Sequence, residues 1–217
     1  MPELTLIIGN KNYSSWSLRP WILLQHLGLE FTEQQIPLDQ ADSAARIRAI
    51  NPAGRVPVLQ HGELLIWESI AIGEYLCELA GQGLPPERAA RAQARSVSAE
   101  MHAGFHALRT QWPMNARALG RRTAMSAALQ GDITRIEHIW GECRGRYGAS
   151  GPWLFGDYSL ADAMYAPVVL RFRTYGARLS ATTQQYVDSA LADAALQEWL
   201  AAAAAEPWTI AADEAGA

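Results

Sequence analysis

Hydroxyl side chains gather where an apolar pattern with helical spacing begins, in the segment Tyr-Ser-Ser-Trp-Ser-Leu-Arg-Pro at residues 13–20. The first N–H groups of a helix have no intrahelical partner, and with the helix dipole they favour negative charge. Ser14 and Ser15 stand at this start and could serve an anion. The ordinary alternative is that Ser17 caps the helix, with Pro20 in its first turn. The residues alone leave both interpretations open.

The sequence Gly-Arg-Val-Pro-Val-Leu at residues 54–59 places Pro57 where a strand pattern opens. Proline is tolerated at a first strand residue, so a trans bond is the ordinary expectation. A cis Val56–Pro57 bond would instead turn the chain sharply and expose the N–H and C=O groups of Val56 to a ligand. The motif on its own favours trans, because only about 5–6% of X-Pro bonds in folded proteins are cis.

Glu68 and Ser69 lie at a junction between a strand pattern and a helix pattern. Ser69 is a natural N-cap, and the dipole of its helix points at the loop. Glu68 is then an acidic residue near the first turn. Together they could bind an amino-acid group, with Ser69 and its N–H on the carboxylate and Glu68 accepting from the ammonium.

In the second half of the chain, Ser159 and Asp162 have the spacing of a capping box, in which each side chain satisfies the other's backbone N–H. This pattern predicts a role in folding more than in catalysis. His102 and His106 lie four apart on one helix face, but no Glu or Cys is spaced to complete a zinc site. We expect no metal.

Basic residues of the same half could face a cleft and bind an anionic substrate, although solvated helix faces are the commoner place for such residues. The candidates are Arg109, Arg117, Arg121 and Arg122.

The elements that must position these motifs alternate over residues 1–80. The expected strands are Leu4–Ile8, Phe31–Ile36, Val56–Gln60 and Leu64–Trp67, and the expected helices are Ser17–Leu27, Ser43–Ile50 and Ser69–Leu79. The order β-α-β-α-β-β-α needs a helical crossover between its first strands and ends in an antiparallel hairpin. It predicts a thioredoxin-like α/β domain.

Glycine and proline in residues 81–87 mark a linker, and strand patterns nearly vanish over residues 88–217. Good helix formers dominate there. The expected helices are Glu87–Leu119, Arg121–Tyr147, Ser159–Tyr175 and Asp193–Glu206. We therefore expect an all-α C-terminal domain.

Charge and composition narrow the function classes. A net charge of −4 without a polybasic block gives no electrostatic case for nucleic acid or an anionic membrane. Cys77 and Cys143 are too far apart in sequence for a metal or CxxC motif, which favours a reducing compartment. The start, Met1-Pro2-Glu3, lacks the pattern of a signal peptide, and no apolar run approaches the roughly 20 residues of a membrane span. We expect a cytoplasmic protein.

Taken in their order, these motifs resemble the glutathione transferase family over nearly the whole chain. Residues 14–19 resemble the SSCSxR signature of the zeta class, except that Trp16 stands where the signature has cysteine. Val56-Pro57 resembles the cis-proline element and Glu68-Ser69 the γ-glutamyl site. Ser159–Asp162 resembles the capping box of the helical domain.

The resemblance implies a two-domain fold that binds glutathione as co-substrate. Ser14 would donate a hydrogen bond to the glutathione sulfur and stabilise the thiolate, with Ser15 as the rival position. The spacing to Arg19 favours Ser14. The implied glutathione-binding residues are Arg55, Val56, Pro57, Glu68 and Ser69, and the implied electrophile-site residues are Arg109, Trp112 and Arg117.

The implied activity is conjugation of glutathione to a small electrophile, or isomerisation of one such as a maleyl-type dicarboxylate. Ser14-x-x-Ser17 stands where thioredoxins have CxxC, so disulfide reduction is disfavoured. The resemblance further implies a homodimer and a role in detoxification. The alternative is a non-catalytic relative that binds a ligand or a protein partner.

Overall fold

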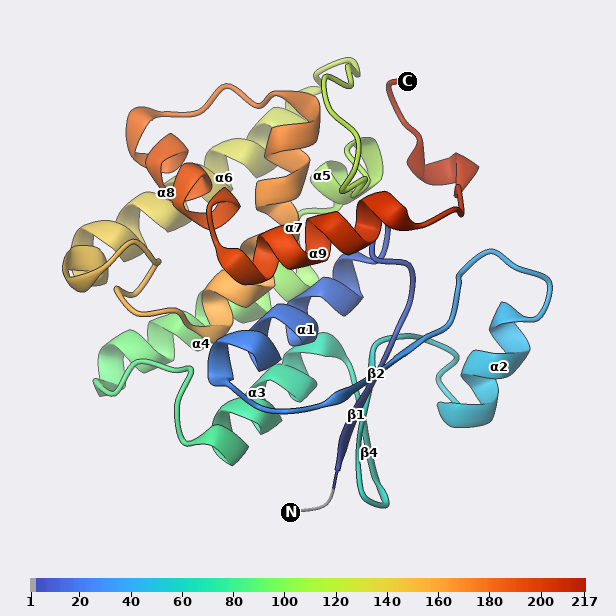
Figure 1. The fold of residues 1–217 in the computed structure, drawn as a ribbon. Helices are drawn as coiled ribbons and strands as arrows, with labels where there is room; N and C mark the ends of the chain where they lie inside the picture. Colours follow the sequence, from blue (N-terminus) through green and yellow to red (C-terminus); the bar gives the residue numbers. More distant parts are fainter. Residues whose placement is uncertain (1–2) are drawn as a thin grey trace.

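The computed structural model describes residues 3–217, whose first elements form a four-stranded mixed sheet in the order β2-β1-β3-β4 (Figure 1). The apolar strand β1 (Leu4–Ile8) lies inside the sheet, parallel to β2 (Thr32–Gln35). On its other side it pairs antiparallel with β3 (Val58–His61), which pairs with β4 (Leu64–Trp67). The predicted order of elements and the thioredoxin-like domain are confirmed.

The sheet is covered on its two faces by different helices. Successive residues of a strand point to opposite faces. Leu6 and Ile8 of β1 therefore join the main core with α1 (Ser15–Leu27) and α3 (Ser69–Ala80). Ile7 joins a small cluster with α2 (Ser43–Ile50), which stands apart on the other side (Figure 1).

The second half of the chain is helical. Its elements are α4 (Arg88–Ala103), α5 (His106–Gln111), α6 (Ala127–Tyr147), α7 (Leu160–Tyr175), α8 (Ala181–Leu191) and α9 (Ala194–Ala205), with short 3₁₀ turns η1 (Gly148–Ser150) and η2 (Ala211–Asp213). Helix α7 is buried on nearly all sides and packs against α1 and α4. The core therefore runs without a break from the sheet into the helices. Within residues 3–217 no helix is both long and apolar enough to cross a bilayer.

Three helix predictions need correction. The expected helix Glu87–Leu119 breaks at Gly104, Phe105 has a φ of 60°, and the chain from Trp112 to Ser126 is irregular. Helix α6 begins at Ala127 rather than Arg121, because the Ser126 side chain caps it by accepting from Leu129 N. Helix α8 is absent from the prediction, and its first turn contains Thr182 and Thr183, which are weak helix formers.

The serine-rich helix starts also differ in detail from expectation. Ser14, not Ser17, is the N-cap of α1. Ser69 is the first residue of α3, and Glu68 occupies the N-cap position with a φ of 69°. The capping box of Ser159 and Asp162 at the start of α7 is confirmed.

Candidate functional site

The start of α1 lies at the end of the loop that follows β1. Ser14 Oγ accepts a long bond of 3.4 Å from Ser17 N and lies 2.7 Å from Ser17 Oγ. Ser17 Oγ in turn accepts from Gly9 N at 3.0 Å. The Ser14 hydroxyl is thus engaged in capping the helix and tying it to the preceding loop.

Ser15 differs from its neighbour, because its hydroxyl has no hydrogen-bond partner anywhere in residues 3–217. It is the first residue of α1, where the helix N-terminus favours negative charge. Both serines line a cleft of about 380 Å³ together with Arg55 and Val56. The Ser15 hydroxyl is therefore free to donate into this serine cleft.

An adjoining cleft of about 330 Å³, the Glu68 cleft, lies where β4 meets α3. It is lined by Val56, Pro57, Glu68 and Ser69, and the Val56–Pro57 bond is cis as the cis-proline element requires. Ser69 is 2% exposed, and its hydroxyl has no partner among the described residues. Burying a hydroxyl without a hydrogen-bond partner costs free energy. A ligand that hydrogen-bonds to the Ser69 hydroxyl in this cleft would recover that cost.

His102 sits beside the acidic residue of the Glu68 cleft, with its Nε2 3.4 Å from Glu68 Oε2. Burial lowers the pKa of His102, and the charges of Arg19 and Arg109 lower it further against the opposing effect of Glu68. The imidazole is therefore neutral at pH 7. The Glu68 side chain therefore faces an uncharged imidazole, and its oxygens can accept from an ammonium group.

The two clefts share Trp16, Arg55, Val56 and Arg109. Two guanidinium groups lie over the Trp16 ring, with the Cζ atom of Arg19 4.1 Å and that of Arg109 4.7 Å from the ring centre. Its edge meets the His102 ring at 5.3 Å. Trp16, which stands where the zeta-class signature has cysteine, is therefore part of the wall between the two clefts.

Buried arginines lie beneath the serine cleft. Arg19 Nε donates to Met164 O and Arg171 Nε to Trp112 O, but an Nη1 atom of each is buried without a partner. Burial and the charges of Arg171 and Arg109 lower the pKa of Arg19. Burial and the charge of Arg109 bring the pKa of Arg171 to about 10, so Arg171 remains charged at neutral pH. Arg109 Nε is likewise buried and unpaired. Arg109 and Arg171 thus give the serine cleft positive charge.

Arg171 was missed from the sequence. It follows Val168, Val169 and Leu170 in a helix that is buried on nearly all sides. An arginine inside a buried apolar run was the available signal, since a charge there needs a partner or a ligand.

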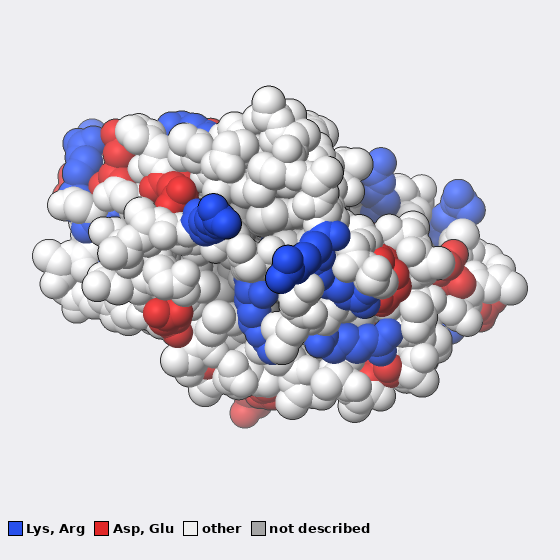
Figure 2. All heavy atoms as spheres, turned by 90° about the horizontal axis from the view of Figure 1, so that it is seen from above, with Lys and Arg blue, Asp and Glu red and all other residues white. Residues whose placement is uncertain are grey.

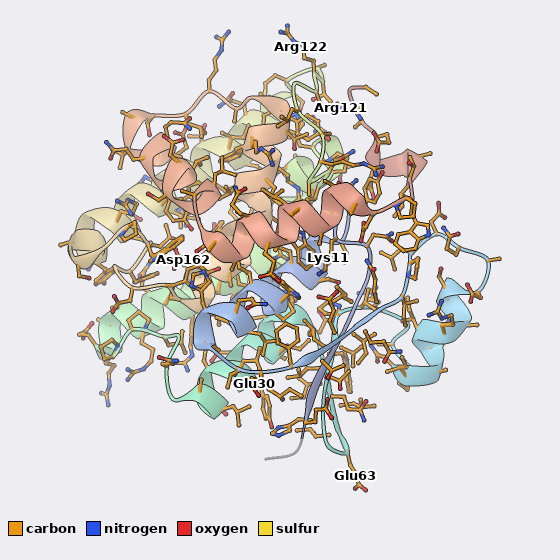
Figure 3. All side chains as sticks on the ribbon, viewed as in Figure 1. Lys11, Glu30, Glu63, Arg121, Arg122 and Asp162 are labelled. Carbon is orange, nitrogen blue, oxygen red and sulfur yellow. The ribbon has the colours of Figure 1, made fainter. Side chains whose placement is uncertain are left out.

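The other predicted electrophile-site residues lie elsewhere. The Trp112 indole donates to Thr123 Oγ1, stacks on Tyr175 and lines a separate cavity with Arg121 and Arg122. Figure 2 shows basic side chains gathered on the face that carries this loop, and Figure 3 shows Arg122 pointing outward there. Arg117 donates to the Glu206 and Trp208 carbonyls. Of the three residues expected to meet the electrophile, Arg109 alone lines the serine cleft.

The chain's own thiols are unsuited to nucleophilic chemistry. Cys77 and Cys143 are buried, and burial raises the pKa of each to about 12. Among the residues described, no three His, Cys, Asp or Glu side chains lie close enough together to hold a metal ion. The polar groups that the clefts offer are hydroxyls, the Glu68 and Asp213 carboxylates, the imidazoles of His102 and His106, and guanidinium cations.

Comparison with known proteins finds relatives of both halves of the chain. The family model described as glutathione S-transferase, N-terminal domain, matches residues 13–79, and that described as glutathione S-transferase, C-terminal domain, matches residues 126–202. A probable maleylacetoacetate isomerase of Caenorhabditis elegans is 27% identical over 82% of this chain and 84% of its own length.

Solved structures share the fold over almost the whole chain. A glutathione transferase homolog from Burkholderia gl BGR1, with bound glutathione, has a TM-score of 0.70 at 24% identity and covers 94% of this chain and 100% of its own. A glutathione transferase from Methylococcus capsulatus has a TM-score of 0.68 at 25% identity, with 93% and 98% covered. With both domain models matched in order along the chain, the protein belongs to the glutathione S-transferase family.

Proposed function

We propose that this protein binds glutathione across the two clefts and activates its thiol for reaction with a small electrophile. The observation that carries the proposal is that both clefts bordered by Trp16 contain polar side chains that are available to a ligand. Ser69 and Glu68 offer a free hydroxyl and a carboxylate in one cleft, and Ser15 offers a free hydroxyl in the other.

The Glu68 cleft suits the γ-glutamyl end of glutathione. An α-amino acid group carries one carboxylate and one ammonium, and charge-assisted hydrogen bonds to such groups are strong. The Ser69 hydroxyl and the first N–H groups of α3 can donate to the carboxylate, while Glu68 accepts from the ammonium. Val56, with Arg55 beside it, then borders the path of the peptide from one cleft to the other.

The serine cleft suits the cysteinyl sulfur. A free thiol has a pKa of about 8.5 and is mostly protonated at neutral pH, whereas the thiolate is the nucleophile. Lowering that pKa by ~2 units needs about 2.7 kcal/mol of differential stabilisation. A hydrogen bond from Ser15 together with the N-terminus of α1 can supply it. Sequence spacing favours Ser14, but the capping bonds of Ser14 favour Ser15 for this role.

The positive charge of Arg109 and Arg171 supports an anionic electrophile at the same cleft. Isomerisation of a maleyl-type dicarboxylate is one such reaction, and the Caenorhabditis elegans relative is described as a probable maleylacetoacetate isomerase. In that reaction the thiolate adds to the double bond and gives an enolate, the resulting single bond rotates, and elimination restores the double bond in the trans form and releases the thiolate. The arginines would hold the carboxylates while the bond rotates.

Calorimetry with glutathione tests the binding site through Glu68→Ala and Ser69→Ala. Each variant should weaken binding by roughly tenfold, about 1.4 kcal/mol. Ser96→Ala is a matched control, because that exposed hydroxyl on α4 bonds only to the Ala92 carbonyl. Parent-like affinity in both site variants would show that the assigned site is wrong.

Turnover is then measured with an aryl halide, an organic hydroperoxide and a maleyl acid. Preference for the maleyl acid supports the isomerase version of the proposal. Glutathione binding without turnover of any of the three would instead favour the non-catalytic alternative.

A further inference from the structure

The loop between β1 and α1 is held by the helical half of the molecule. Lys11 O accepts from Trp199 Nε1 at 2.8 Å, and Asn12 O accepts from Ala116 N at 3.0 Å. The Asn12 side chain bonds to Asn115 Oδ1 and to Arg117 N. The loop that leads to Ser14 is therefore shaped by residues distant in sequence.

The Glu206 side chain accepts hydrogen bonds from two backbone N–H groups of this loop. Glu206 follows α9 directly and is 8% exposed. Its Oε1 accepts from Lys11 N at 2.6 Å and its Oε2 accepts from Asn12 N at 3.0 Å. Gln35 Nε2 also donates to Oε1.

The carboxylate of Glu206 has no ion-pair partner within residues 3–217. The Lys11 ammonium lies beside Glu33 instead, 2.8 Å from its Oε2, and Figure 3 shows Lys11 next to α9. A buried carboxylate bonded to consecutive backbone N–H groups forms strong, directional hydrogen bonds. Glu206 therefore fixes backbone position rather than balancing a charge.

The fixed residues lie immediately before the serines. Asn10 O accepts from both Tyr13 N and Ser14 N, so the loop closes as a tight turn around Lys11 and Asn12. A shift of these two residues would move Ser14, the N-cap of α1, and with it Ser15. Misplacement of a reacting group by about 1 Å can lower a rate on the order of 100-fold.

We propose that Glu206 is a positioning residue for the thiol-activating hydroxyl. Its carboxylate clamps Lys11 and Asn12 and so sets where the Ser15 hydroxyl stands relative to the glutathione sulfur. This inference rests on the proposed function, and it makes the C-terminal end of α9 a determinant of thiol ionisation in the N-terminal domain.

The test compares Glu206→Ala and Glu206→Gln with Asp193→Ala. Asp193 caps the opposite end of α9 by accepting from Leu196 N at 3.0 Å, and its Oδ1 lies 3.1 Å from His26 Nε2 in the last turn of α1. Its loss therefore weakens α9 and the contact of α9 with the far end of α1 without touching the loop. Amide hydrogen exchange of Lys11 and Asn12 is measured without ligand. The pH titration of bound glutathione thiolate is measured alongside glutathione affinity.

Glu206→Ala should raise exchange at Lys11 and Asn12 roughly tenfold or more and raise the pKa of bound glutathione by roughly 1 unit. Glutathione affinity should change much less, because Glu68 and Ser69 are untouched. Glu206→Gln, which keeps an acceptor oxygen, should lie between Glu206→Ala and the parent. Asp193→Ala should leave both measurements at the parent's values.

An unchanged thiol pKa in Glu206→Ala would overturn the inference, whether or not exchange rises. Equal changes in Asp193→Ala would also overturn it, since they would reflect general loosening. A parent that binds no glutathione would contradict the proposed function itself, and that result is recognised before any variant is compared.

Discussion

Helices α1 and α7 both begin behind a serine cap, and they differ in whether the polar atoms around that cap are hydrogen-bonded within the fold. At α7 the Asp162 carboxylate accepts from Ser159 N, Ser159 Oγ, Leu154 N and Tyr186 Oη at 2.8–3.0 Å and is 2% exposed. Figure 3 shows Asp162 inside the helical half. At α1 the Ser15 hydroxyl has no partner within residues 3–217 and borders a cleft.

The difference separates a folding motif from a candidate binding site. A buried polar group that is satisfied inside the fold stabilises the fold, whereas an unsatisfied one is a cost that evolution retains where a ligand completes it. Ser69 and the arginines below the serine cleft also have polar side-chain atoms without a partner among the described residues, and those atoms are buried. The two helix starts therefore differ in whether their polar side-chain atoms have hydrogen-bond partners within the fold, although both carry serine.

The distinction between the two helix starts would be wrong if the capping box of α7 were needed for turnover. Asp162→Ala leaves buried donors without an acceptor and should lower the free energy of unfolding by about 3 kcal/mol. For a chain of this size that corresponds to a fall in Tm of roughly 6–12 °C. The protein that remains folded should keep its kcat/KM. Thermal denaturation and turnover on the same samples check this.

Ser159→Ala is the matched control at α7, and it should cost about 1 kcal/mol because the carboxylate keeps its other donors. Parent-like stability with lost turnover in Asp162→Ala would reverse the assignment of this motif to folding.

The same comparison extends to arginine side chains. Arg109 has an unpaired buried Nε at the serine cleft, whereas Arg135 forms a paired contact with Glu100 at the surface. Arg109→Ala should raise KM for a maleyl-type acid by roughly 30-fold, about 2 kcal/mol. Arg135→Ala should leave it near the parent's value. Steady-state kinetics with the acid and with a neutral aryl halide separate the two effects.

An equal loss for the acid and the halide in Arg109→Ala would indicate folding damage instead of lost charge recognition. That control is needed because Arg109 also donates to the carbonyls of Met101 and His102 at the end of α4.

The sequence predicted the parts of the fold that depend on local pattern. The apolar strand Leu4–Ile8, the antiparallel hairpin that ends with Leu64–Trp67 and the spacing of Ser159 and Asp162 each correspond to an observed element. The break at Gly104 and the irregular chain from Trp112 to Ser126 were not predicted, although Gly104, Pro113 and Gly120 are poor helix formers and gave a local signal for both. The Trp112 and Asn115 carbonyls of this segment accept instead from side chains of α7.

The sequence indicated several residues that line the two clefts, but it did not indicate which distant residues lie beside them. Glu68, Ser69, Val56 and the serines meet around Trp16 as the motif order suggested. Arg171 and Glu206 could not be recognised as partners of the serine loop, because they lie more than 150 residues from it and only the tertiary fold brings them there. Trp112 and Arg117 were expected near the electrophile, but their partners lie in a neighbouring cavity and the C-terminal segment.

The central claim is that the unpartnered Ser15 hydroxyl stabilises the thiolate of bound glutathione. Its most direct test is the thiolate absorbance of bound glutathione against pH for Ser15→Ala and Ser14→Ala beside the parent. Ser15→Ala should raise the pKa of the bound thiol by about 1 unit, or 1.4 kcal/mol, while Ser14→Ala lowers stability and changes that pKa less. An unchanged titration in Ser15→Ala with a raised pKa in Ser14→Ala would move the role to the capping serine, and unchanged titrations in both would contradict activation by serine.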